Sequence, residues 1–129
     1  MNRAIISLGA NTATAATALD SALELLGAYG TITRSSGNFY AAAEGNPGAP
    51  PYLNNIVELD TAMDYRQLQS LTKDYEKQAR TAAAAAPLVA IDIDIVVFDG
   101  TVLRPEMMQA QYFTKGMRAL SEIPQPCNP

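Results

Sequence analysis

The sequence predicts an α+β domain in which one antiparallel sheet carries two helices on the same face. Two observations support this prediction. Strand-like and helix-like segments follow one another in the order strand, helix, strand, strand, helix, strand. In the segments at 52–60 and 90–98, residues of opposite character alternate, which is typical of a sheet with one buried face. A chain of 129 residues can bury one core, so we expect a single domain over residues 1–129.

The first part of the chain predicts a strand, a helix and a weak second strand. Residues 3–8 form the first strand, and Asn11 can cap the helix after the turn at 9–11. The helix spans 12–29, ends near Gly27 and Gly30, and has one apolar stripe made of Ala15, Leu19, Ala22, Leu23 and Leu26. Residues 31–40 form a strand that Ser35-Ser36-Gly37 weakens, and the Pro- and Gly-rich residues 41–51 form a loop.

The middle of the chain predicts a third strand and a second helix. In the strand at 52–60, Leu53, Val57 and Leu59 point towards the helices, whereas Tyr52, Asn54 and Ile56 point to the opposite face. Asp64 and Gln67 have the spacing of a capping box at the start of the helix. Its apolar stripe contains Leu68, Leu71, Tyr75 and Ala79. The alanine-rich residues 81–87 predict either a loop or an extension of this helix.

The last part of the chain predicts a fourth strand over residues 90–98 and three short elements. Asp99-Gly100 is typical of a tight turn, after which residues 101–103 can pair back. Short helices are expected at 106–109 and 114–121. The complete order is the split βαβ pattern, βαββαβ, of a ferredoxin-like fold. Because both helices of that pattern lie on one face, we expect the other face to be free for a ligand.

Two acids stand out in the fourth strand. Asp92 and Asp94 are two residues apart, so they share one face, whereas Ile91, Ile93, Ile95 and Val97 share the other. The two carboxylates repel each other, and no lysine or arginine follows closely enough in the sequence to relieve them. Mg²⁺ held by one or two carboxylates and substrate phosphates would do so. The alternative is that both acids belong to the solvated face of an ordinary antiparallel strand.

Composition excludes several functional classes. The net charge of −4 argues against a broad nucleic-acid or anionic-membrane surface. There is no histidine and only one cysteine, Cys127, which excludes disulfides within the chain and Cys/His zinc sites. No segment resembles a membrane span, and the apolar stretch after Arg3 is too short for a signal peptide. We therefore expect a cytoplasmic protein without nucleic-acid or membrane partners.

Several motifs, in order and with matching spacing, resemble the 6-hydroxymethyl-7,8-dihydropterin pyrophosphokinase family over roughly residues 3–100. The resemblance rests on the ordered set and not on any single motif. The motifs are Ser7-Leu8-Gly9-Ala10-Asn11, Asn38-Phe39-Tyr40, Tyr52-Leu53-Asn54-Asn55, Glu76 with Arg80, and Ile91-Asp92-Ile93-Asp94-Ile95 with Phe98.

The resemblance implies a ferredoxin-like enzyme of folate biosynthesis that transfers pyrophosphate from ATP to the hydroxymethyl group of the pterin with Mg²⁺. By resemblance, Asp92 and Asp94 are the metal ligands, and Asn54 and Tyr52 bind the pterin. Metal ions held by carboxylates supply the charge neutralisation that this chemistry needs. The remaining candidates are Gly9 and Tyr40 for the pterin, Arg104, Tyr112 and Lys115 for the nucleotide, and Arg80 as a catalytic residue.

Two alternatives remain open at this point. The family carries a long loop with arginines and a tryptophan before the aspartates, whereas residues 81–90 contain no arginine, lysine or tryptophan. The chain could therefore be a degenerate relative that binds a pterin or nucleotide without chemistry. It could also be an interaction domain whose sheet face meets a second subunit, and the sequence does not decide between monomer and dimer. Individual residues have plainer interpretations too: Gly9 as a turn glycine, and Glu76 with Arg80 as a surface pair.

Overall fold

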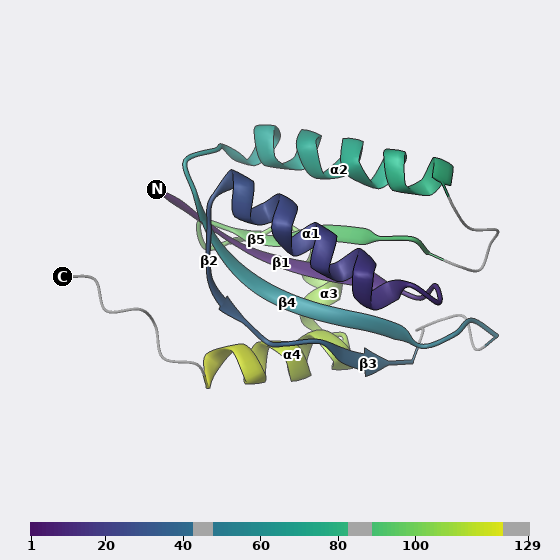
Figure 1. The fold of residues 1–129 in the computed structure, drawn as a ribbon. Coiled ribbons are helices and arrows are strands. Elements are labelled where there is room, and N and C mark those ends of the chain that lie inside the picture. Colours follow the sequence, from purple (N-terminus) through teal and green to yellow (C-terminus); the bar gives the residue numbers. More distant parts are fainter. Residues whose placement is uncertain (43–47, 83–88, 123–129) are drawn as a thin grey trace.

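The computed structural model describes residues 1–42, 48–82 and 89–122, and within them a six-stranded antiparallel sheet forms the centre (Figure 1). The strand order is β2-β4-β1-β5-β6, and β3 pairs with β4 beside this path. The middle strand, β1, pairs with β4 on one side and with β5 on the other. The strands are β1 (Asn2–Ala10), β2 (Thr31–Ser35), β3 (Phe39–Ala41), β4 (Tyr52–Thr61), β5 (Asp92–Phe98) and β6 (Thr101–Val102).

Two long helices, α1 (Ala15–Tyr29) and α2 (Tyr65–Ala82), cover one face of the sheet (Figure 1). Their apolar stripes pack on the inward residues of β1, β4 and β5, as the alternation in the sequence predicts. Leu71 is the exception: the sequence predicts it in the stripe of α2, but it lies beside Arg66, Gln67 and Ser70. Leu53, Val57 and Leu59 belong to this core. The predicted α+β, ferredoxin-like architecture is therefore confirmed.

The opposite face is not entirely free, which corrects one expectation. The helices α3 (Pro105–Met108) and α4 (Gln111–Ser121) lie against it and bury a second, smaller core. α4 approaches β4 closely at Gly116, where a Cβ atom would lie 2.3 Å from Cγ1 of Ile56. The core residues are Ile5, Ile56, Val96, Met107, Phe113 and Leu120. This face is thus bounded by C-terminal helices that the βαββαβ pattern does not contain.

A bulge in β5 overturns one predicted side-chain direction. Ile5 of β1 stands opposite Val97, but Ile6 stands opposite Ile95, so Val96 is the extra residue of β5. An extra residue shifts the two-residue alternation beyond it. Val97 therefore packs against the second core on the α3 and α4 side, and does not share a face with Ile93 and Ile95 as predicted.

Two local features predicted from the sequence, a helix cap and a hairpin turn, match the structure, whereas another helix cap and a strand differ from the prediction. Asp64 and Gln67 form the predicted reciprocal cap, with N–H to side-chain distances of 2.8 and 3.0 Å. Asp99 and Gly100 have φ angles of 49° and 80°, as a tight hairpin turn requires. The N-cap of α1 is Thr14 and not Asn11, whose backbone and side chain bond instead to Val89. The predicted strand at 31–40 is broken into β2 and β3.

Some predictions concern parts of the chain outside the described residues. They are the greater part of the alanine-rich segment 81–87, the middle of the loop 41–51, and Cys127. Among the residues that the structure describes, no helix is both long and apolar enough to cross a membrane.

Candidate active site

The two acids of β5 lie on the face that carries α3 and α4. Asp92 stands directly opposite Gly9 of β1, and Asp94 stands opposite Ser7. Residues that face each other in an antiparallel pair project from the same side of the sheet. Asp94 is buried and Asp92 is half-buried, so neither is a freely solvated strand residue.

The pterin-binding candidates of β4 complete a row across the sheet. Gly9 stands opposite Asp92 on one side and opposite Asn54 on the other. A Cβ atom on Gly9 would lie 3.1 Å from Oδ1 of Asn54 and 3.3 Å from Cδ2 of Tyr52. Nδ2 of Asn54 donates to the main-chain oxygen of Tyr52 at 3.2 Å, which orients the amide. The structure thus brings Asp92, Asp94, Asn54 and Tyr52 together around the space that Gly9 leaves.

Asp92 has the most perturbed environment of this group. Burial, the charge of Asp94, a hydrogen bond with Asp94 and the charge of Glu76 together raise the pKa of Asp92 to about 7, although Lys73 acts in the opposite direction. The charge of Asp92, added to burial, raises the pKa of Tyr52, so the phenol lies within the electrostatic reach of the acid. A strand carboxylate with no role would not need this unfavourable arrangement, and perturbed acids are typical of functional sites.

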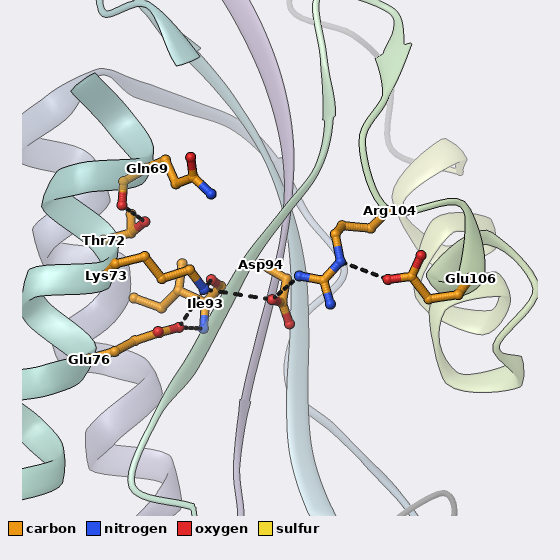
Figure 2. Close-up of polar contacts among 8 residues, drawn as sticks. All are labelled: Gln69, Thr72, Lys73, Glu76, Ile93, Asp94, Arg104 and Glu106. Carbon is orange, nitrogen blue, oxygen red and sulfur yellow. Dashed lines mark hydrogen bonds and ion pairs between the residues drawn. The ribbon is translucent and has the colours of Figure 1, made fainter. Parts of the chain in front are cut away.

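Asp94, by contrast, contacts two cations from other elements (Figure 2). Nη1 of Arg104 donates to its Oδ1 at 2.9 Å, and Nζ of Lys73 lies 3.8 Å from the same oxygen. No cation lies close to the acids in the sequence, but the fold brings two of them to Asp94. Arg104 follows β6 and Lys73 lies on α2, so folding supplies what neighbouring sequence does not.

Lys73 and Glu76 also bind the backbone of β5, which sequence reasoning missed. Glu76 accepts the N–H of Ile93, and Nζ of Lys73 donates to the carbonyl oxygen of Ile93 at 3.0 Å (Figure 2). The two side chains also pair with each other at 3.3 Å. Because the helix satisfies backbone groups of β5, it fixes this strand beside the acids. Glu76 is buried, so the interpretation as an ordinary surface pair with Arg80 is wrong.

The other sequence candidates differ in how close they lie to the row. Tyr40 stands opposite Leu53, on the other side of the sheet from Asn54, and is 70% exposed. Phe39, which was not a candidate, stands opposite Asn54 and extends the row. Nζ of Lys115 on α4 lies 5.7 Å from the centre of the Phe39 ring. Two candidates have other surroundings: Tyr112 packs beside the second core, and Arg80 is exposed in the last turn of α2.

The donor set of the row fits a hard divalent cation. Within the described residues no group of three or more acids, histidines or cysteines could hold a metal ion, so Asp92 and Asp94 stand as a pair. Mg²⁺ commonly uses only one or two protein carboxylates and completes its shell with water and substrate phosphates. The mutual repulsion that raises the pKa of Asp92 is the interaction that a cation between the two acids would reverse.

Comparison with known proteins gives one result that covers almost the whole chain. A model of the family described as 7,8-dihydro-6-hydroxymethylpterin-pyrophosphokinase (HPPK) matches residues 5–122. No curated protein matches the chain. The family match includes every strand residue of the row, from Gly9 to Asp94, and the helices that bound it. The chain therefore belongs to the HPPK family.

Proposed function

We propose that this member of the HPPK family transfers the pyrophosphoryl group of ATP to the hydroxymethyl group of 6-hydroxymethyl-7,8-dihydropterin, a reaction of folate biosynthesis in the cytoplasm. In this reaction the hydroxymethyl oxygen bonds to the β-phosphorus, the bond between that phosphorus and the oxygen of the α-phosphate breaks, AMP leaves and the hydroxyl proton is released. The observation that carries the proposal is the row of Asn54, Gly9 and Asp92 across three adjacent strands, with Asp94 beside it.

Asn54 and Tyr52 are the proposed pterin-binding residues. A carboxamide both donates and accepts hydrogen bonds, which matches the alternating donors and acceptors on the edge of a pterin ring. The hydrogen bond from Asn54 to the Tyr52 carbonyl fixes the amide, and the phenol ring supplies a flat apolar surface. Gly9 leaves the space that a ring substituent needs between these residues and Asp92. Tyr40 is a weaker candidate because it points to the other side of the sheet.

Asp92 and Asp94 are the proposed Mg²⁺ ligands. When bound, the ion supplies charge neutralisation for the polyphosphate. The chain itself supplies positive charge at the same place through Arg104 and Lys73, which lie at Asp94. We propose Arg104, together with Lys115 and Tyr112 of α4, as the nucleotide-binding residues, and Arg80 as a further cation that reaches the phosphates.

A turnover assay tests the proposal. We expect the chain to release AMP from ATP only when 6-hydroxymethyl-7,8-dihydropterin and Mg²⁺ are both present. Asp92→Asn should lower kcat/KM at least about 100-fold, because a metal ligand contributes several kcal/mol of charge stabilisation. The matched control is Asp20→Asn, since Asp20 is exposed on α1. AMP release by the native chain no faster than by Asp92→Asn would refute the proposal.

The second candidate function is binding without turnover, and one observation favours it. Residues 81–90 contain no arginine, lysine or tryptophan, although phosphoryl transfer benefits strongly from positioned arginines. In that case calorimetry would detect binding of the dihydropterin or the nucleotide, while AMP release would equal that of Asp92→Asn.

A further inference from the structure

We propose that Arg104 is an internal counter-ion of the acidic pair, and that it exchanges Asp94 for the polyphosphate of the nucleotide when a divalent cation binds. The inference rests on the proposed function, because it specifies how one site couples two ligands. It predicts that the cation binds weakly to the free protein and tightly together with the nucleotide.

The contacts of Arg104 place it between a buried acid and an exposed one. Nη1 donates to Oδ1 of Asp94 at 2.9 Å, and Nε donates to Oε1 of Glu106 at 2.7 Å (Figure 2). The side chain of Asp94 is 11% exposed, whereas those of Arg104 and Glu106 are 44% and 61% exposed. The acid is therefore held in the sheet, and the arginine reaches it from the solvent side.

The main chain around Arg104 is tied down, so that movement is confined to its side chain. The backbone N–H groups of Leu103 and Arg104 both donate to the carbonyl oxygen of Val96, at 2.8 and 3.3 Å. Val96 is the bulged residue of β5, two positions after Asp94. The bulge thus anchors the segment that carries Arg104 beside the acids. A flexible side chain on this fixed base can change partner without any change in the fold.

The charges dictate which exchange is favourable. Arg104 and a divalent cation on Asp94 would repel each other strongly at short range, because the site is partly shielded from water. An arginine that leaves a carboxylate is best accommodated by phosphate oxygens, which accept two of its N–H groups at once. A cation that binds alone must therefore break the ion pair between Arg104 and Asp94 without compensation, which weakens its binding. When a nucleotide binds as well, its phosphates take up the released arginine, which strengthens binding of the cation. By linkage the two ligands strengthen each other equally.

Binding of Mn²⁺, measured by electron paramagnetic resonance on the full chain, tests this coupling. Mn²⁺ prefers the same oxygen ligands as Mg²⁺. The nucleotide is an ATP analogue with a methylene group between the α and β phosphates, which cannot be cleaved. We expect the analogue to tighten Mn²⁺ binding at least about tenfold in the native chain, which lies within the usual range of coupling between two ligands.

Two variants separate the effect of Arg104 from other causes. In Arg104→Gln, Mn²⁺ alone should bind about 3- to 10-fold more tightly, the scale of a half-exposed ion pair, and the effect of the analogue should shrink by at least the same factor. Arg104→Lys keeps the charge, so its affinity for Mn²⁺ alone should stay close to that of the native chain, and its response to the analogue should exceed that of Arg104→Gln. The matched control is Arg66→Gln, since Arg66 is exposed on α2.

Three results would overturn the inference: no Mn²⁺ binding to the native chain and Arg104→Gln alike, an unchanged Mn²⁺ affinity in Arg104→Gln, or equal behaviour of the Lys and Gln variants. The proposed reaction fails separately. A chain that shows the coupling but releases no AMP refutes the reaction and supports the inference, whereas AMP release without the coupling refutes the inference alone.

Discussion

The same face of the sheet carries two sites with buried or half-buried carboxylates, Glu58 at one and Asp92 at the other, and their electrostatics are opposite. At one end, Glu58 of β4 accepts hydrogen bonds from Thr33 and Arg34 and lies 3.8 Å from Arg3. At the other, Asp92 of β5 lies beside Asp94 and near Glu76. Burial opposes ionisation of Glu58, but its hydrogen bonds and the two arginines outweigh burial and lower its pKa. Burial and neighbouring acids raise the pKa of Asp92.

The contrast between Glu58 and Asp92 distinguishes a structural carboxylate from a functional one. The chain provides Glu58 with enough positive charge to be stable as an anion in the free protein. For the pair in β5 it provides Arg104 and Lys73 at Asp94 but leaves Asp92 destabilised as an anion. An acid that the fold itself satisfies contributes to stability, whereas one that the fold leaves unsatisfied is prepared for a ligand.

The largest effect on stability is expected at the satisfied acid. Glu58→Gln removes the charge that holds Arg34 and Arg3, and should lower the free energy of unfolding by about 2 to 3 kcal/mol near pH 7. Urea unfolding followed by far-UV circular dichroism measures this, with exposed Glu24→Gln of α1 as the control. Because the folded pKa is lowered, the contribution of Glu58 is present above its unfolded pKa and disappears as the pH falls through the folded value. If Glu58→Gln and Glu24→Gln are equally stable at pH 7, Glu58 is not a stabilising carboxylate and its contrast with Asp92 is wrong.

A smaller effect on stability, of opposite sign, is expected at Asp92, the acid that the fold leaves unsatisfied. Because the folded pKa of Asp92 is about 7 and its ordinary value is 3.8, the folded state binds more protons between these values and loses stability as the pH rises through them. Asp92→Asn should therefore be more stable than the native chain by about 2 kcal/mol at pH 8, less than the full linkage value because a buried amide also has a desolvation cost.

The difference should be much smaller near pH 4, where Asp92 is protonated in the folded state and the pH lies close to its ordinary pKa of 3.8. Thermal unfolding at pH 4, 6 and 8 in the presence of a metal chelator measures it, with Asp20→Asn as the control. A variant that is less stable than the native chain at pH 8 would contradict the assignment of Asp92 as an unsatisfied acid.

The smallest effect on stability is expected at Gly9, which separates the acid from the pterin-binding candidates. A Cβ atom there would press on Oδ1 of Asn54 at 3.1 Å and on the Tyr52 ring at 3.3 Å. Gly9→Ala should change the free energy of unfolding by less than about 1 kcal/mol, because the crowding offsets the entropy that alanine removes from the unfolded chain.

The effect of Gly9→Ala on binding should be larger than its effect on stability, and it should be specific to the pterin. We expect the affinity for 6-hydroxymethyl-7,8-dihydropterin to fall about tenfold in Gly9→Ala, as displacement of one hydrogen-bonding group would cause, while nucleotide affinity stays unchanged. Calorimetry with each ligand measures both, and Gly27→Ala is the control, since nothing lies within 4 Å of a Cβ atom there. Equal losses for both ligands would show that Gly9 does not mark the pterin side of the row.

Sequence alone determined the features of this protein that depend on neighbours along the chain. The two-residue period of a strand is enough to put Asp92 and Asp94 on one face and Leu53, Val57 and Leu59 on the other. The hairpin turn at Asp99-Gly100 and the capping box at Asp64 are equally local, because each depends only on residues within one turn.

The surroundings of those acids, by contrast, depend on how distant segments pack together. Lys73 and Arg104 lie on separate elements, 21 and 10 residues from Asp94 along the chain, and no periodicity predicts their meeting. The bulge at Val96 depends on its pairing with β1, and α3 and α4 cover the face because of apolar surface contributed by several strands. A local pattern fixes the direction of a side chain, but its charge environment depends on distant segments that share no sequence signal with it.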